Sequence, residues 1–166
     1  PGCVHLGINN THKLGSIGKA GYGWKTSIVS NKGIPVPIGT VGELSVKGNG
    51  LMVENYKDSQ ATAQTLKNGW LMTGDMAYED EEGFIYLMGR KKDLIISGGE
   101  NIYPIEIENF LRTNNKIKDV AVIGTPNDRI GEEIVAIIEI KSGVQCSKTE
   151  IKKYCLNLPS YKRPHK

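Results

Sequence analysis

The alternation of apolar and polar residues predicts short strands in the first half of the chain. Glycine-rich turns break residues 13–50 into brief segments, and two of these, 25–30 and 42–47, alternate like strands with one buried face. Two longer apolar runs follow, separated by the acidic stretch 79–83, which ends in glycine. Two apolar runs around such a turn are typical of a β-hairpin.

Three helices are expected. Residues 58–67 are expected to form a short helix with Asp58 as its N-cap. A second helix is expected to begin at Pro104, because proline suits the first helical position and apolar residues follow at helical spacing. A third follows the capping box at 147–150. With strands expected at 94–96, 120–123 and 134–140, the second half is predicted to be a small α+β unit.

Composition narrows the class of protein. Of 166 residues, 39% are hydrophobic and 23% charged, which is ordinary for a globular chain. The formal net charge of +3 is too small to indicate a nucleic-acid-binding protein. No apolar run approaches the roughly 18 residues of a membrane span. Three widely spaced cysteines fit neither a disulfide framework nor a zinc site, so a cytoplasmic protein is expected.

Charge also indicates a boundary near Arg90. Residues 1–90 carry eight basic and eight acidic side chains, whereas residues 91–166 carry thirteen basic and ten acidic side chains. The three histidines have no metal-ligand spacing and are expected at the surface.

Several short motifs are ambiguous when taken singly. GSIGK at 15–19 resembles a phosphate loop but lacks the required spacing and the helix after it, so it is interpreted as a turn. Asp75 ends a Thr-Gly-Asp turn, and a carboxylate there either serves the turn or accepts hydrogen bonds from a ribose diol. Arg90 is either a solvated arginine or a partner for ribose or phosphate. The serine and glycines at 97–99 form a tight turn or let a ligand approach the backbone.

The order of these motifs is more specific than any one of them. Together they resemble the later core motifs of the AMP-forming acyl-CoA synthetases, which belong to the adenylate-forming superfamily. The segments that carry the resemblance are GEL at 42–44, GWLMTGD at 69–75, EEGF at 81–84, GRKKDLI at 89–95, SGGENIYPIEIE at 97–108, and GTPND with GE at 124–128 and 131–132. The GSIGK turn and YKRPHK at 161–166 also match segments of this family.

The resemblance implies an α+β protein in two parts. Residues 1–91 would be the short, β-rich, barrel-like end of a large N-terminal AMP-binding domain. Residues 92–166 would be a small mobile C-terminal domain, a three-stranded sheet with helices, truncated before its terminal catalytic lysine motif.

The resemblance also implies a reaction and its residues. A carboxylic acid, fatty or aryl, reacts with ATP in the presence of Mg²⁺ to form an acyl-adenylate, and coenzyme A then takes the acyl group. Asp75 and Arg90 would bind the ribose of the nucleotide, and Lys92 would be the hinge. Ser97, Gly98 and Gly99 would line the coenzyme A tunnel.

Other family motifs are not found in the sequence. The phosphate loop, the magnesium-binding glutamate and the acid pocket are expected upstream of residue 1, and the adenylation lysine is expected beyond Lys166. The chain is therefore expected to be a piece of a larger enzyme and to be inactive alone. Two alternatives stay open: a non-catalytic binding module of the same fold, and part of an adenylation domain that loads a carrier protein. The Tyr-Pro pair at 103–104 argues against the second.

Overall fold

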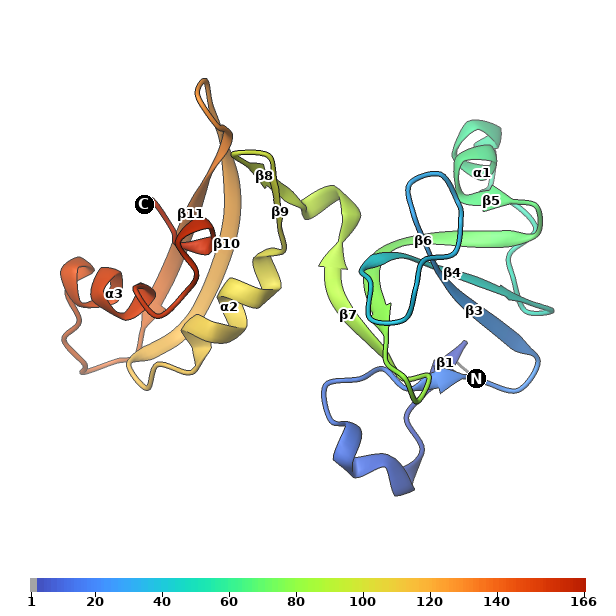
Figure 1. The fold of residues 1–166 in the computed structure, drawn as a ribbon, viewed down its shortest axis with the longest axis horizontal. Helices are drawn as coiled ribbons and strands as arrows, with labels where there is room; N and C mark the ends of the chain where they lie inside the picture. Colours follow the sequence, from blue (N-terminus) through green and yellow to red (C-terminus); the bar gives the residue numbers. More distant parts are fainter. Residues whose placement is uncertain (1–2) are drawn as a thin grey trace. The chain divides into compact units, whose positions relative to one another are not determined.

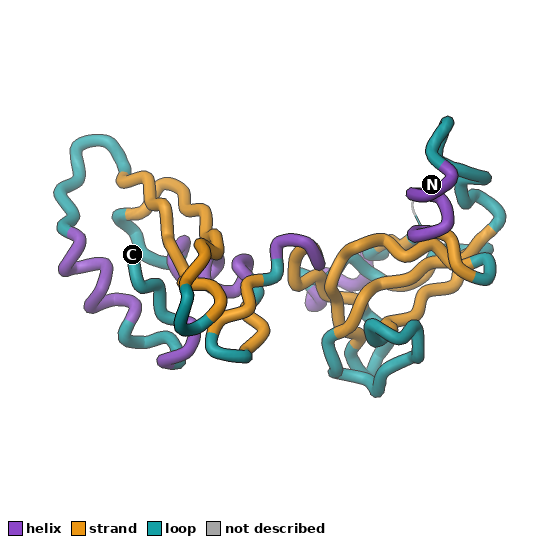
Figure 2. Tube along the Cα trace, turned by 90° about the horizontal axis from the view of Figure 1, so that it is seen from above, coloured by secondary structure: helices purple, strands orange, loops and turns teal. Residues whose placement is uncertain are grey.

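The computed structural model describes residues 3–166, and the chain divides into two compact units, Pro1–Lys91 and Lys92–Lys166 (Figure 1). Unit 1 consists mainly of strands, while unit 2 combines strands with two longer helices (Figure 2). Across residues 3–166, no helix has the length and apolar character needed to cross a membrane.

Unit 1 is built around a five-stranded antiparallel sheet. Its order is β3-β4-β6-β5, and β7 pairs with a further part of β6. A small two-stranded sheet, β1-β2, lies outside this path. The elements are β1 (Val4–His5), η1 (Ile8–Lys13), β2 (Lys19–Ala20), β3 (Trp24–Val29), β4 (Gly42–Gly48), α1 (Ser59–Thr65), β5 (Leu66–Lys67), β6 (Trp70–Glu79) and β7 (Ile85–Arg90).

The core of unit 1 follows from the period-two pattern of its strands. Leu44 and Val46 of β4 point to the same face as Ile28 of β3, and all three are buried with Ala77 and Ile85. Successive strand residues face opposite sides of a sheet, so the residues between them lie on the other face.

Two sequence predictions for this unit are confirmed. Asp58 caps α1, since its carboxylate accepts a hydrogen bond from the Ala61 amide at 2.8 Å. The acidic stretch forms the β6–β7 hairpin turn, where the Asp80 carboxylate accepts from the Phe84 amide at 2.9 Å. Both carboxylates satisfy amides that secondary structure leaves without a partner.

Unit 2 carries a four-stranded antiparallel sheet in the order β10-β11-β8-β9. A short 3-10 turn, η2 (Lys91–Asp93), precedes it. The other elements are β8 (Ile95–Ser97), β9 (Glu100–Ile102), α2 (Pro104–Arg112), β10 (Ile117–Asn127), β11 (Gly131–Ile140), α3 (Lys148–Cys155) and η3 (Ser160–Lys162).

Both long helices of unit 2 cover one face of the β10–β11 pair. Ile107 and Leu111 of α2 are fully buried, and Cys155 of α3 is buried in the same cluster as Val120 and Val122 of β10. The predicted apolar stripe of α2 is therefore confirmed. The predicted cap of α3 is confirmed by Ser147 Oγ, which accepts a hydrogen bond from the Glu150 amide at 3.2 Å. Burial raises the pKa of the Cys155 thiol, and all three cysteines are free.

The α+β class is confirmed, but the sheet of unit 2 has four strands where three were expected. The additional strand, β9, pairs back onto β8 through the turn at Gly98 and Gly99. It contains only Glu100, Asn101 and Ile102. Three residues are too few to show an alternating pattern, and strand pairing is set by the turn instead.

Lys13 holds the first segment of unit 1 onto the hairpin. Its ammonium lies 2.8 Å from Asp80 Oδ2 and 2.6 Å from Glu82 Oε1. The hydrogen bond from Lys13 is the largest cause of an Asp80 pKa below its usual value of 3.8, and backbone amides of the turn act in the same direction. A carboxyl whose folded-state pKa is lowered contributes stability above its unfolded pKa, and this contribution is lost as the pH falls through the folded-state value.

Lys13→Met is expected to raise the pKa of Asp80, because the strongest donor to its carboxylate is removed. NMR titration of the Asp80 carboxyl carbon measures this pKa directly. The same variant is expected to lose less stability than the parent chain below about pH 4. Lys19→Met is the control, since Lys19 lies over the Phe84 ring rather than on Asp80. An unchanged Asp80 pKa in Lys13→Met would contradict this account.

Candidate functional site: a bulge with Asp75 and Arg90, and a glycine turn at Ser97

The β6–β7 pairing brings two of the predicted site residues together. Asp75 and Arg90 are register partners, and Arg90 Nη1 donates to Asp75 Oδ1 at 2.6 Å. Arg90 Nη1 also lies 3.3 Å from the Thr73 carbonyl oxygen. The Asp75 side chain is 28% exposed and that of Arg90 52%, so both remain accessible to a ligand. The pair presents a carboxylate with further acceptor capacity beside a guanidinium with further donors.

Asp75 lies on a bulge in β6. The β4–β6 register runs from Glu43 opposite Met76 to Ser45 opposite Met72, so the Thr-Gly-Asp segment stands opposite one residue of β4. Gly74 has φ +74°, a backbone conformation that would be strained in a residue with a side chain. A bulge bends a strand and re-aims its side chains. The Thr-Gly-Asp motif therefore redirects Asp75 within the sheet.

Thr73 and Glu43 hold this bulge in place. Thr73 Oγ1 donates to the Leu44 carbonyl at 2.9 Å and accepts from the Asp75 amide at 3.0 Å. Glu43, which is 7% exposed, accepts from the Gly74 amide at 3.2 Å through Oε1. Its other oxygen accepts from Lys91 Nζ at 2.8 Å. The contact of Glu43 with the bulge was not predicted from the sequence.

Lys92 lies in the short turn η2 and is exposed. Among residues 3–166 its side chain has no hydrogen-bond or ion-pair partner, unlike the neighbouring Lys91. The two compact units divide between these two lysines.

The predicted glycine turn connects β8 and β9. Gly98 and Gly99 have φ values of +60° and +85°, a left-handed conformation that glycine adopts without strain. A Cβ at either position would meet no other atom within 4 Å in this structure. The left-handed backbone conformation therefore explains why glycine occupies both positions, and steric crowding within unit 2 does not. Ser97 is 8% exposed.

The β10–β11 hairpin positions this turn. Gly98 donates its amide to the Ile130 carbonyl at 2.8 Å, and Glu132 Oε2 accepts from the Ile96 amide at 2.7 Å. A Cβ on Gly124 would lie 2.6 Å from Glu132 Oε1, so glycine at 124 makes room for this carboxylate. No role for Glu132 was predicted from the sequence. Glu132 lies beside Glu133 at the start of β11, and its place in the GE segment at 131–132 was the available signal.

The two lysines at the end of the chain take part in ion pairs of unit 2. Lys162 Nζ lies 2.9 Å from Glu106, and Lys166 pairs with Glu133. The hydrogen bond from Lys166 is the largest cause of a Glu133 pKa below its usual value. The histidines are exposed, as expected.

Comparison with known proteins identifies the family. Residues 106–166 match the family model of the AMP-binding enzyme C-terminal domain. An indoleacetate–CoA ligase of Aromatoleum aromaticum is 47% identical over 126 residues, which are 76% of this chain and 25% of that protein. A 2-succinylbenzoate–CoA ligase of Bacillus cereus is 42% identical over 155 residues, 93% of this chain and 32% of that protein. The chain belongs to the family of AMP-binding enzymes.

The structural comparison gives the same result. An o-succinylbenzoate CoA synthetase from Bacillus subtilis, solved in complex with its acyl-adenylate intermediate, superposes with a TM-score of 0.91. Its sequence is 36% identical, and the match covers 100% of this chain and 34% of that protein. The resemblance inferred from the ordered motifs is confirmed. The chain spans about a quarter to a third of the length of these AMP-binding relatives and corresponds to their C-terminal part.

Glu132→Met is expected to release the Ile96 amide, because methionine has a similar length but no carboxylate oxygen to accept its hydrogen bond. Hydrogen exchange of that amide, followed by NMR, should accelerate by about tenfold or more. Glu139→Met is the control, since Glu139 lies on the same strand as Glu132 but pairs with the exposed Lys118 of β10. Equal exchange rates at Ile96 in both variants would show that Glu132 does not hold this strand.

Proposed function

We propose that this chain is part of an AMP-forming acid–CoA ligase. Such an enzyme joins a carboxylic acid to the AMP portion of ATP, releasing pyrophosphate, and then transfers the acyl group to the thiol of coenzyme A with loss of AMP. The pair formed by Asp75 on the β6 bulge and Arg90 at the end of β7 is the observation that carries the proposal, because it offers the acceptor and donor groups that a ribose diol needs. The names of the relatives support the same reaction class.

The described residues fit the nucleotide but not a metal ion. Asp75 keeps acceptor capacity after its bond with Arg90, and both side chains are accessible. Across residues 3–166, no group of three His, Cys, Asp or Glu side chains could hold a metal. Mg²⁺ would therefore be bound by a part of the enzyme outside these residues.

Lys92 and the Ser97 turn would serve the second step. The side chain of Lys92 is not tied to any described residue, which suits a hinge that changes its backbone angles. Ser97, Gly98 and Gly99 form a turn held by Ile130 and, through β8, by Glu132, so the turn would move as a rigid part of unit 2. In this proposal it lines the path of the coenzyme A thiol.

The acid is proposed to be a fatty or aryl carboxylic acid, and coenzyme A is the proposed acceptor. Relatives named for indoleacetate and 2-succinylbenzoate support a ligase of this general class. A module that binds nucleotide without catalysing a reaction is the second candidate. The Asp75–Arg90 pair supports it as well, because binding a ribose does not require the other family motifs. An adenylation domain that loads a carrier protein stays as a further alternative.

AMP is expected to shift the amide resonances of Asp75 and Arg90 when it is titrated into the 166-residue chain. Asp75→Asn should weaken this binding by about tenfold, because an amide is a weaker acceptor for the ribose hydroxyls and loses the charge-assisted bond with Arg90. Glu54→Gln, which removes one negative charge elsewhere in unit 1, is the control. Shifts spread over the chain and unchanged by Asp75→Asn would contradict the assignment of Asp75.

The chain alone is expected to produce no acyl-adenylate. It contains no phosphate loop and no Gly-Lys pair after YKRPHK to place a cation on the reacting phosphate. ATP–pyrophosphate exchange with a panel of fatty and aryl acids measures this step, and the full-length enzyme serves as the positive control. Exchange by the purified chain would contradict this prediction.

A further inference from the structure

The strand register of unit 1 aligns three lysines and a tryptophan in one row across the sheet. Lys25 of β3 pairs with Lys47 of β4, and Lys67 of β5 pairs with Trp70 of β6. The β4–β6 pairing ends with Val46 opposite Leu71, so Lys47 and Trp70 are the next residues of their strands beyond this pair. Directly opposite residues share a face of a sheet, and like charges in that position destabilise it. An anion bound over this row would relieve the repulsion.

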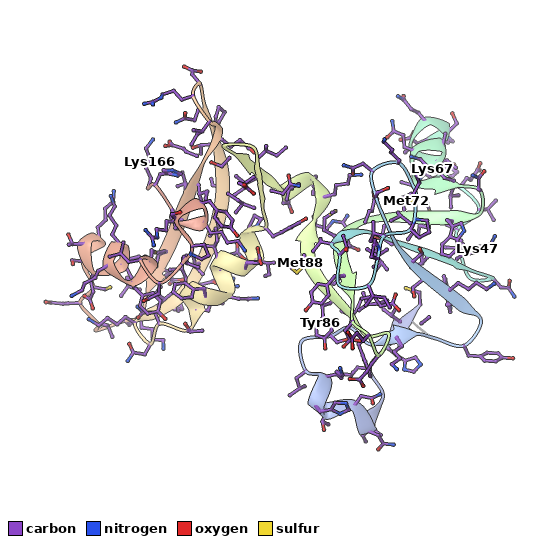
Figure 3. The ribbon with its side chains drawn as sticks, in the orientation of Figure 1. Lys47, Lys67, Met72, Tyr86, Met88 and Lys166 are labelled. Carbon is purple, nitrogen blue, oxygen red and sulfur yellow. The ribbon has the colours of Figure 1, made fainter. Side chains whose placement is uncertain are left out.

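The next row forms the floor of a hollow on the same face. Ser27 pairs with Ser45, which pairs with Met72. The hollow has a volume of about 400 Å³, and its walls come from the loop after β3 and from the β5–β6 turn. Lys32 of that loop and Lys67 at the end of β5 both line the hollow, so each of these two walls contributes a cation. Figure 3 labels Met72, Lys67 and Lys47 on these strands.

Lys47 reaches toward the β5–β6 turn. A Cβ built on Gly69 would lie 3.4 Å from Lys47 Nζ, so the ammonium lies over the turn itself. Asn68 and Gly69 have φ values of +53° and +75°, which form a tight hairpin turn. This turn brings the ammonium of Lys47 close to the wall that Lys67 and Asn68 form.

The donors around the hollow have no acceptors in the described part of the chain. Lys25, Lys32, Lys47 and Lys67 form no ion pair among residues 3–166, and no acidic side chain lines the hollow. The indole N–H of Trp70 also has no hydrogen-bond partner there. By contrast, three other basic side chains of this unit are paired with carboxylates: Lys13, Arg90 and Lys91.

We propose that this hollow binds a small organic phosphate ester or diphosphate. Its volume lies within the range of about 300–1,000 Å³ usual for small-molecule pockets. Lys32 of the loop after β3 and Lys67 of β5 line the hollow, and Lys47 lies over the adjoining turn. Such a set of ammonium groups matches an anion with more than one negative charge and several acceptor oxygens. Trp70 and Met72 supply apolar surface for the organic part of the ligand. The site shares no residue with the Asp75–Arg90 pair and does not rest on the proposed function.

Titration of the 166-residue chain with inorganic pyrophosphate at fixed ionic strength, followed by NMR, tests the site. Saturable shifts are expected at the Trp70 indole N–H, Asn68 and Gly69. The double variant Lys47→Gln and Lys67→Gln should raise the dissociation constant by about tenfold or more. The control double variant, Lys141→Gln and Lys153→Gln, removes the same charge from unit 2 and should change it less than about twofold. Phenyl phosphate should in addition shift the Met72 methyl group.

The proposal is overturned if the parent chain shows no saturable shifts at these residues. It is also overturned if both double variants weaken binding equally, which would indicate only general charge attraction, or if the shifts gather at Asp75 and Arg90. The parent-chain titration decides the question even if the Lys47→Gln and Lys67→Gln variant does not fold.

Discussion

A carboxylate removed from water must be paired and hydrogen-bonded, and Glu43 meets this requirement at the centre of unit 1. One of its oxygens accepts from the Gly74 amide and the other from Lys91. The first contact holds the bulge that carries Asp75. The second holds the last residue of the unit, directly after Arg90 in the chain. Replacing Glu43 would therefore loosen both sides of the Asp75–Arg90 pair.

Unit 2 uses the same principle on its own strands. Glu132 reaches across from β11 to the Ile96 amide of β8, and Gly124 on the adjacent strand leaves the space that the carboxylate needs. The glycine turn after Ser97 is thereby attached to the β10–β11 hairpin, which is the longest strand pair of the chain. These two contacts fix the turn to the sheet of unit 2, as the proposed role in lining the coenzyme A path would require.

Two groups of cations in unit 1 have different physical consequences. Lys13, Arg90 and Lys91 each hold a carboxylate that also serves the backbone or the candidate site. The lysines around the Ser27–Ser45–Met72 floor have no such partner among the described residues. A paired cation stabilises the fold, whereas a set of unpaired cations on one face attracts an anion from solution.

The sequence by itself determined the elements whose signals are local. The N-cap at Asp58, the proline start of α2 and the capping box of α3 depend on neighbouring residues only, and each lies where the pattern predicted it. The family could also be predicted from the sequence, because the order of its motifs can be recognised without knowing any contact between residues.

The tertiary structure alone decided the strand β9, the bulge at Asp75 and the partners of Glu43 and Glu132. β9 is too short for a periodic signal, and its pairing depends on the turn at Gly98 and Gly99. The bulge exists only relative to β4, so no property of residues 73–75 alone defines it. The carboxylates meet partners 31 to 48 residues away in the chain, and only the strand register brings them together.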